Sequence, residues 1–107
     1  MKLAIFLGDA RNTIGAFPEL ARREAGFQLD RVQNGKDPDD WKPLGIVGPG
    51  VREIRIREPG GAFRVVYYAH FEEAVYVLHA FRKKTQKTAK RDLELAASRY
   101  AQLMVHR

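Results

Sequence analysis

Three strand-like segments joined by short turns occupy residues 51–81 of this 107-residue chain. Val51–Arg57 alternates isoleucine with charged residues, which is the period of a half-buried strand. Phe63–Ala69 and Ala74–Phe81 are dense in β-branched and aromatic residues, a composition typical of strands. Because such short connections join antiparallel neighbours, the three segments predict a β-meander.

The residues before this meander predict a strand and two helices. Leu3–Leu7 is a short apolar run that predicts a buried strand. Asp9 can cap a short helix over Arg11–Phe17. A longer helix is expected from Pro18, which suits a first turn, to Gly35, a common helix stop.

The remaining segments complete the expected fold. Trp41–Val47 predicts a short edge strand, which gives the meander three or four strands, and Thr88 can cap a C-terminal helix. The order predicts one α+β domain over residues 1–107: a strand, two helices, an antiparallel meander and a final helix. We expect one sheet face to pack on helices and the other, which carries Arg55 and Arg57, to be open.

The charge of the chain is concentrated in its second half. Residues 1–50 carry seven acidic and seven basic side chains, whereas residues 51–107 carry six acidic and twelve basic ones and hold the whole net charge of +6. Six basic side chains and no acidic one lie between Phe81 and Arg91. A cationic loop between two ordered elements attracts phosphates and indicates a nucleic acid or another polyanion, with solubility as the alternative.

Several classes of function are disfavoured by composition. The chain has no cysteine, so we expect neither disulfides nor thiol chemistry. No apolar run is long enough to span a membrane or to form a signal peptide, and we expect a cytoplasmic protein. Asp37, Asp39 and Asp40 cluster around a proline and predict a solvated connector, so we expect no metal site and no cofactor.

An ordered set of motifs resembles the phage-derived HigB-like toxins of the RelE/ParE superfamily, over roughly residues 10–100. The motifs are Leu29–Pro38, Trp41–Leu44, Gly50–Arg55, Phe63–Tyr67, Val77–Thr88 and Asp92–Arg99. Ala89 departs from the proline that the family often has after the threonine. The resemblance implies a RelE-like fold and the toxin half of a type II toxin–antitoxin pair.

The resemblance also implies an activity and partners. RelE-like and HigB-like toxins cleave mRNA without metal, usually in the ribosomal A site, and a helix-turn-helix antitoxin encoded next door neutralises them. ParE-like relatives share the fold but poison DNA gyrase, so a gyrase-inhibiting toxin without catalysis remains an alternative. An inert prophage-derived module that only binds an antitoxin is a second alternative.

Metal-free RNA cleavage requires neutralisation of charge on the phosphoryl oxygens and stabilisation of the leaving 5′-oxygen. Arg64 matches the arginine of the family's aromatic-Arg-Val-x-Tyr strand, and we expect it to face the scissile phosphate from an open sheet face. The alternative is a solvated strand arginine paired with a neighbouring glutamate. Arg55 could extend the same patch, and Lys83 and Lys84 leave the last strand beside it. These four residues are our candidate catalytic groups.

Four further residues are weaker candidates for the site. Arg57, Gln86 and Lys87 are candidate RNA- or phosphate-binding residues, although each could simply face water. Tyr67 belongs to the matching motif and could orient the nucleotide, but it alternates with Val65 and could equally be core.

No histidine is predicted to be the general base. His79 alternates with Val75, Val77 and Phe81, so we expect it on the same sheet face as these residues, as a hydrogen-bonded core histidine. The other two histidines of the chain are expected to be incidental.

Overall fold

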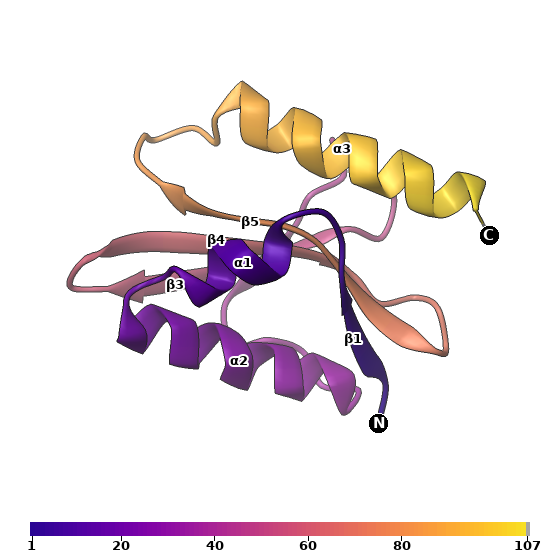
Figure 1. The fold of residues 1–107 in the computed structure, drawn as a ribbon, viewed down its shortest axis with the longest axis horizontal. Coiled ribbons are helices and arrows are strands. Elements are labelled where there is room, and N and C mark those ends of the chain that lie inside the picture. The colour runs from indigo at the N-terminus through magenta and orange to yellow at the C-terminus, as the bar shows by residue number, and fades with distance from the viewer. Residues whose placement is uncertain (107) are drawn as a thin grey trace.

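The computed structural model describes residues 1–106 and has the predicted α+β order (Figure 1). The elements are β1 (Leu3–Phe6), α1 (Ala10–Gly15), α2 (Glu19–Gln33), β2 (Trp41–Pro43), β3 (Arg52–Glu58), β4 (Gly61–Tyr68), β5 (Ala74–Lys83) and α3 (Lys90–Val105). Within residues 1–106, none of the helices combines the length and the apolar composition that crossing a bilayer requires.

One five-stranded mixed sheet organises the molecule. Its strand order is β1-β5-β4-β3-β2, and β2 to β5 form the predicted antiparallel meander with four strands. β1 returns to the other edge and pairs parallel to β5. Because β1 is an edge strand, its side chains are not fully buried, and Leu3 is 68% exposed. The expectation of a buried N-terminal strand is therefore wrong.

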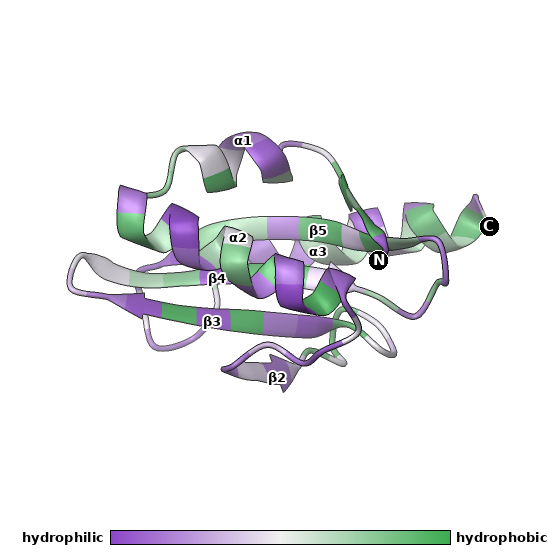
Figure 2. Ribbon diagram, turned by 90° about the horizontal axis from the view of Figure 1, so that it is seen from below, coloured by the Kyte–Doolittle hydropathy of each residue, from purple (hydrophilic) through white to green (hydrophobic). Residues whose placement is uncertain are grey.

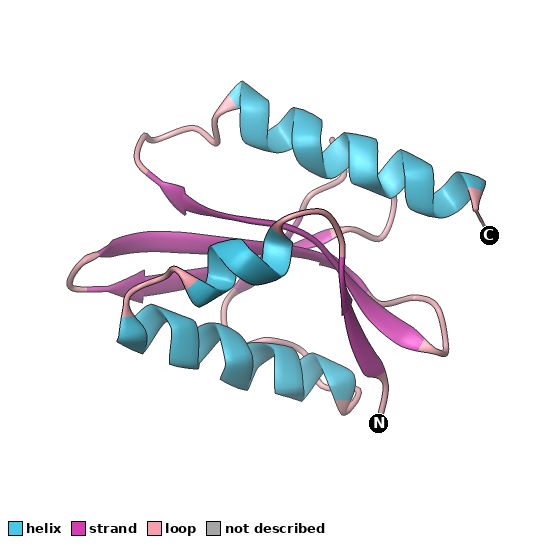
Figure 3. Ribbon diagram, in the orientation of Figure 1, coloured by secondary structure: helices cyan, strands magenta, loops and turns pink. Residues whose placement is uncertain are grey.

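Helices cover both faces of the sheet, which Figure 3 shows as α1 and α2 on one side and α3 on the other. The apolar positions of α1 and α2 pack against inward-facing residues of β3, β4 and β5 in one core. The apolar stripe of α3 packs in a second core against Val66, Leu78 and Phe81. The expectation of one open face is thus wrong for the part of the sheet that α3 crosses.

Hydrophobic and hydrophilic residues nevertheless alternate along β3 as predicted (Figure 2). Ile54 and Ile56 lie in the core beneath α2, and Arg57 is exposed on the other face, where Arg55 is half-buried. In the sheet register Arg55 is opposite Arg64, and Arg64 is opposite Phe81. These three side chains form one row across the α3 face.

A β-bulge in β5 changes the predicted placement of His79. Val66 pairs with His79 and Tyr67 pairs with Val77, so Leu78 has no opposite residue on β4. The extra residue shifts the alternation, a known effect of bulges. Val77 faces α2, whereas Leu78 and His79 both turn towards α3, so His79 does not share a face with Val77.

Two predicted helix caps are also wrong. Asp9 precedes α1, but its side chain makes no cap hydrogen bond and instead accepts one from Arg99. α3 begins at Lys90 after Ala89, so Thr88 lies outside the cap position. Gly35 ends α2 as predicted, with a φ of +80° that suits glycine.

Candidate functional site

A groove lined by basic side chains lies on the α3 face, beside the loop after β5. It consists of two open depressions of about 530 and 370 Å³, and both are lined by Lys83 and Gln86. We call the pair the cationic groove. Its basic residues are Lys42, Arg57, Arg64, Lys83, Lys84 and Lys87. The structure therefore brings together five of the six predicted basic residues and adds Lys42.

The second depression also has apolar walls, formed by Leu44, Ile46 and Leu93. Ile46 is among the most exposed large apolar residues of the described chain. Neither Lys42 nor Ile46 was predicted, because nothing in the sequence places the β2 region next to the loop after β5. The register of β2 with β3, which sets Lys42 opposite Glu53, is what brings them there.

Arg64 forms part of the groove wall but is 4% exposed, which corrects the expectation of an open-face arginine. Its Nη1 donates to the carbonyl of Phe63 at 3.1 Å, and its Nε lies 3.5 Å from Glu53 Oε1. Neither contact uses Nη2. Burial lowers the pKa of Arg64, an effect that the Glu53 carboxylate opposes. Arginine stays charged even so.

Glu53 is completely buried beside Arg64 and was not among the predicted site residues. Lys42 Nζ lies 3.6 Å from Glu53 Oε1, on the other side from Arg64. Both carboxylate oxygens and Arg64 Nε lack a hydrogen bond of normal geometry. The contacts are ionic but loose. The only sequence signal was a charged residue in a strand expected to be central, a position where unpaired charge is rare.

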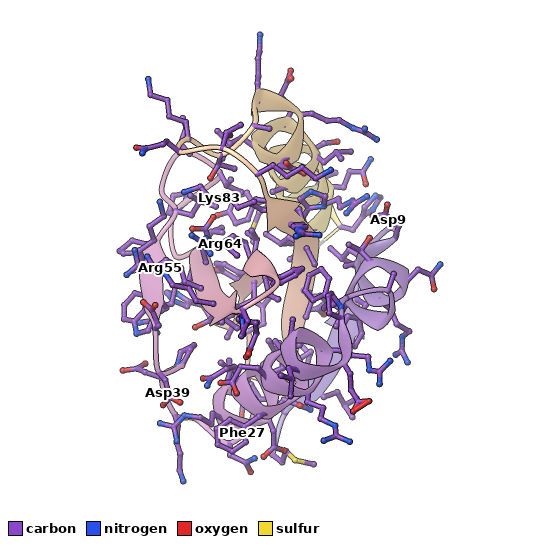
Figure 4. All side chains as sticks on the ribbon, turned by 90° about the vertical axis from the view of Figure 1, so that its left-hand side faces the viewer. Asp9, Phe27, Asp39, Arg55, Arg64 and Lys83 are labelled. Carbon is purple, nitrogen blue, oxygen red and sulfur yellow. The ribbon has the colours of Figure 1, made fainter. Side chains whose placement is uncertain are left out.

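Lys83 occupies the junction of the two depressions and is half-buried. Burial lowers its pKa, and the positive charges of Arg64 and Lys42 lower it further. A lysine in this setting gives up its proton more readily than a free one. In Figure 4, Arg55, Arg64 and Lys83 lie near one another on one side of the view, and Asp9 lies on the other side.

Arg55 is bonded to another group and does not line the groove. Its Nε and Nη2 lie 2.9 and 2.8 Å from Asp40 Oδ1. Asp37 pairs with Arg52 in the same way at 2.9 Å. The segment that includes Asp37 and Asp40 thus makes ion pairs with β3 while both carboxylates stay well exposed, which fits the prediction of a solvated connector. In residues 1–106 no three His, Asp or Glu side chains are grouped as metal ligands would be.

Tyr67 lies on the opposite face of the sheet from Arg64. It is buried in the core beneath α2, so the core interpretation of this residue is the one that fits. Burial raises the pKa of its hydroxyl, and the nearby Arg52 guanidinium opposes that shift without completing a hydrogen bond of normal geometry. A nucleotide in the cationic groove could not reach Tyr67.

His79 is a buried, fully hydrogen-bonded histidine, as predicted. Its Nε2 lies 2.8 Å from Asp92 Oδ1, and Arg99 Nη1 lies 3.2 Å from Nδ1. Because arginine only donates, Nδ1 accepts, and the proton of the neutral ring is on Nε2. Arg99 also donates to Leu78 O at 3.0 Å and to Asp9 Oδ1 at 2.9 Å, and this bond lowers the pKa of Asp9. We call this the His79 network.

Comparison with known proteins places the chain by family. The family model described as "Phage derived protein Gp49-like (DUF891)" matches residues 12–101, which is most of the chain. No curated protein matches the sequence significantly.

Proposed function

Since the chain belongs to the family of phage-derived Gp49-like proteins, we propose that it is a HigB-like toxin of a type II toxin–antitoxin pair. In this proposal it is an endoribonuclease that cleaves mRNA on the ribosome without metal. The observation that carries the proposal is the cationic groove, in which Arg64 is next to a lysine with a lowered pKa. The helix-turn-helix antitoxin is the implied protein partner.

The groove offers the groups that this reaction needs. Arg57, Lys84 and Lys87 are exposed and can hold successive phosphates of a single strand by charge. Arg64 Nη2 is available to a non-bridging phosphoryl oxygen, where positive charge stabilises the transition state. Ile46 and Leu93 provide apolar surface for a base.

The bond changes define the role of Lys83. The 2′-oxygen attacks phosphorus and loses its proton, the bond from phosphorus to the 5′-oxygen breaks, and a cyclic phosphate and a 5′-hydroxyl form. Lys83 donates the proton that the leaving 5′-oxygen takes up. A lowered pKa brings that proton closer to the operating pH, which favours general acid catalysis. No residue of the chain is assigned as general base.

Expression in bacteria tests the proposal. We expect wild-type protein to arrest growth and Lys83→Ala protein, at equal abundance, to do so far less. Primer extension on cellular transcripts should show new 5′ ends inside coding regions that disappear when translation is blocked.

Two results would contradict the proposal. Intact mRNA together with a DNA-damage response would indicate a gyrase-inhibiting toxin. Normal growth with folded protein accumulating would indicate an inert antitoxin-binding module.

A further inference from the structure

β5 continues beyond the strand that pairs with its outer edge. β1 pairs with β5 only from Ala74 to Val77. In Figure 1, β5 runs on towards the loop that leads to α3, past the end of β1. Within residues 1–106 no strand pairs with the outer edge of His79–Lys83. About half of the backbone N–H and C=O groups of this segment point away from β4, because these groups alternate along a strand.

A cavity of about 460 Å³ lies along this edge. Its floor follows β5 residue by residue from His79 to Lys83 and continues to Lys84 in the loop beyond. Asp9 and Thr13 form one side, and Asp92 and Leu95 of α3 help to form the other. The cavity is thus a slot between α1 and α3, and it extends the line that β1 leaves. His79–Lys83 spans roughly 16 Å at about 3.3 Å per residue. We call this cavity the edge slot.

Apolar surface and unbalanced positive charge characterise the edge slot. Phe81, Ala89 and Leu95 contribute apolar atoms to its walls. Its two acids are already bonded, Asp9 to Arg99 and Asp92 to His79.

The basic side chains of the edge slot have no such partners. In the part of the chain that the structure describes, Arg82, Lys83, Lys84 and Arg91 have no acidic partner. The slot therefore attracts an occupant that carries negative charge and some apolar groups.

The unpaired edge distinguishes between a polypeptide and a nucleic acid. The outward N–H groups alternate with carbonyl oxygens, and a second polypeptide backbone satisfies both. A phosphate chain would satisfy only the donors and would bring its oxygens near the carbonyls. An acidic peptide in extended conformation matches both the edge and the charge.

We propose that the edge slot docks an extended acidic segment of a protein partner, which adds as a strand to His79–Lys83. The segment would carry acidic side chains towards Lys84 and Arg91 and apolar ones towards Phe81 and Leu95. Strand addition is a general mode of peptide recognition, with backbone hydrogen bonds supplying affinity. This proposal does not depend on RNA cleavage, because it rests on the outer backbone edge of β5. Lys83, Lys84 and Thr85 line both the slot and the cationic groove.

Solution NMR with a synthetic peptide tests the docking. The probe is an acetylated octapeptide of alternating glutamate and valine, titrated into isotope-labelled full-length protein. We expect amide shifts centred on His79–Lys83 and slower hydrogen exchange there. The same peptide with every backbone nitrogen methylated keeps its charge but cannot pair as a strand. Its affinity should be at least tenfold weaker.

A matched pair of variants distinguishes peptide binding in the edge slot from nonspecific charge attraction to the protein. Arg91→Glu reverses a charge in the slot, and Lys90→Glu reverses one at an adjacent residue that does not line it. Both add an acid to the first turn of α3, where the helix dipole favours it. We expect Arg91→Glu to weaken the peptide at least tenfold and Lys90→Glu to weaken it less than threefold.

Three outcomes would overturn the inference. One is the absence of shifts along His79–Lys83 at millimolar peptide. Another is equal affinity of the methylated and unmethylated peptides, which would indicate charge attraction alone. The third is hexauridylate RNA shifting His79–Lys83 while the peptide does not, which would assign the slot to nucleic acid.

Discussion

Two charged clusters lie on the α3 face of the sheet, and they are bonded very differently. In the His79 network every ring nitrogen has a partner, at 2.8 and 3.2 Å. In the pair formed by Glu53 and Arg64 the closest approach is 3.5 Å, and three buried polar atoms lack a hydrogen bond. The His79 ring has no bonding capacity left. In the second cluster the unbonded atoms are buried out of reach of a ligand, and only Arg64 Nη2, which neither contact uses, keeps capacity for one.

The part of the sheet that α3 covers explains why the two clusters differ in bonding. Asp92 and Arg99 belong to α3 and supply the partners of His79. Arg64 instead lines the depression beside the loop before the helix. Within residues 1–106, no side chain of a helix lines that depression or completes the bonds of Arg64. A charged cluster whose polar atoms are all hydrogen-bonded thus indicates a structural role. A cluster with unbonded polar atoms next to an open depression indicates a functional site.

The largest predicted effect concerns the ion pair of Arg64 with Glu53. Arg64→Ala should lower the free energy of unfolding by about 3–5 kcal/mol, because it leaves the Glu53 carboxylate buried opposite only Lys42. Urea denaturation measures this. The double variant Arg64→Met with Glu53→Gln should recover much of the loss. A change below about 1 kcal/mol for Arg64→Ala, as for an exposed ion pair, would show that water reaches the pair of Arg64 and Glu53 in solution.

Lys83 should affect the reaction rather than the fold. Lys83→Ala should slow cleavage on translating ribosomes about a hundredfold, the lower range for a lost general acid. Because the pKa of Lys83 is lowered, it should lose its proton below the usual lysine value of about 10.4, and the cleavage rate should fall as pH rises through that pKa.

Two measurements check the role of Lys83. Lys83→Arg should remove the alkaline decline, because arginine stays protonated. A wild-type cleavage time course from Lys83→Ala would remove Lys83 from the mechanism even if the protein proves toxic.

The His79 network should contribute to stability alone. His79→Ala removes two side-chain hydrogen bonds and should lower the free energy of unfolding by about 1–3 kcal/mol. The cleavage rate per folded molecule should not change, since both ring nitrogens are bonded within the protein. Activity assays at a temperature where the variant remains folded make the comparison. A large loss of rate there would give His79 a chemical role.

The smallest effect is expected at the rim of the groove. Lys87→Ala should weaken binding of single-stranded RNA by removing one phosphate contact. The slope of log affinity against log salt should fall by about 0.7. Lys90→Ala, which removes the same charge outside the groove, should change the slope less. Equal slopes for the two variants would mean that only net charge matters.

The sequence was sufficient to predict the element order, the meander and the gathering of most groove residues, because these depend on local periodicity and on the motif resemblance. It was insufficient for Arg64 and Glu53, whose burial depends on what α3 and the neighbouring strands cover. Ion pairs such as that of Arg55 with Asp40 join residues 15 apart and leave no local pattern. The cap expected from Thr88 was wrong because the helix begins later than the residue type suggested.

The bulge at Leu78 has a consequence for how this chain can evolve. One additional residue sets the phase of the rest of β5, so it decides which side chains of the next five residues enter the cationic groove. Pairing without the bulge, with Leu78 retained, would turn Lys83 towards α1 and α2 and present Arg82 in its place. A change that abolishes the bulge but keeps its extra residue would therefore alter the chemistry of the groove without replacing any residue that lines it.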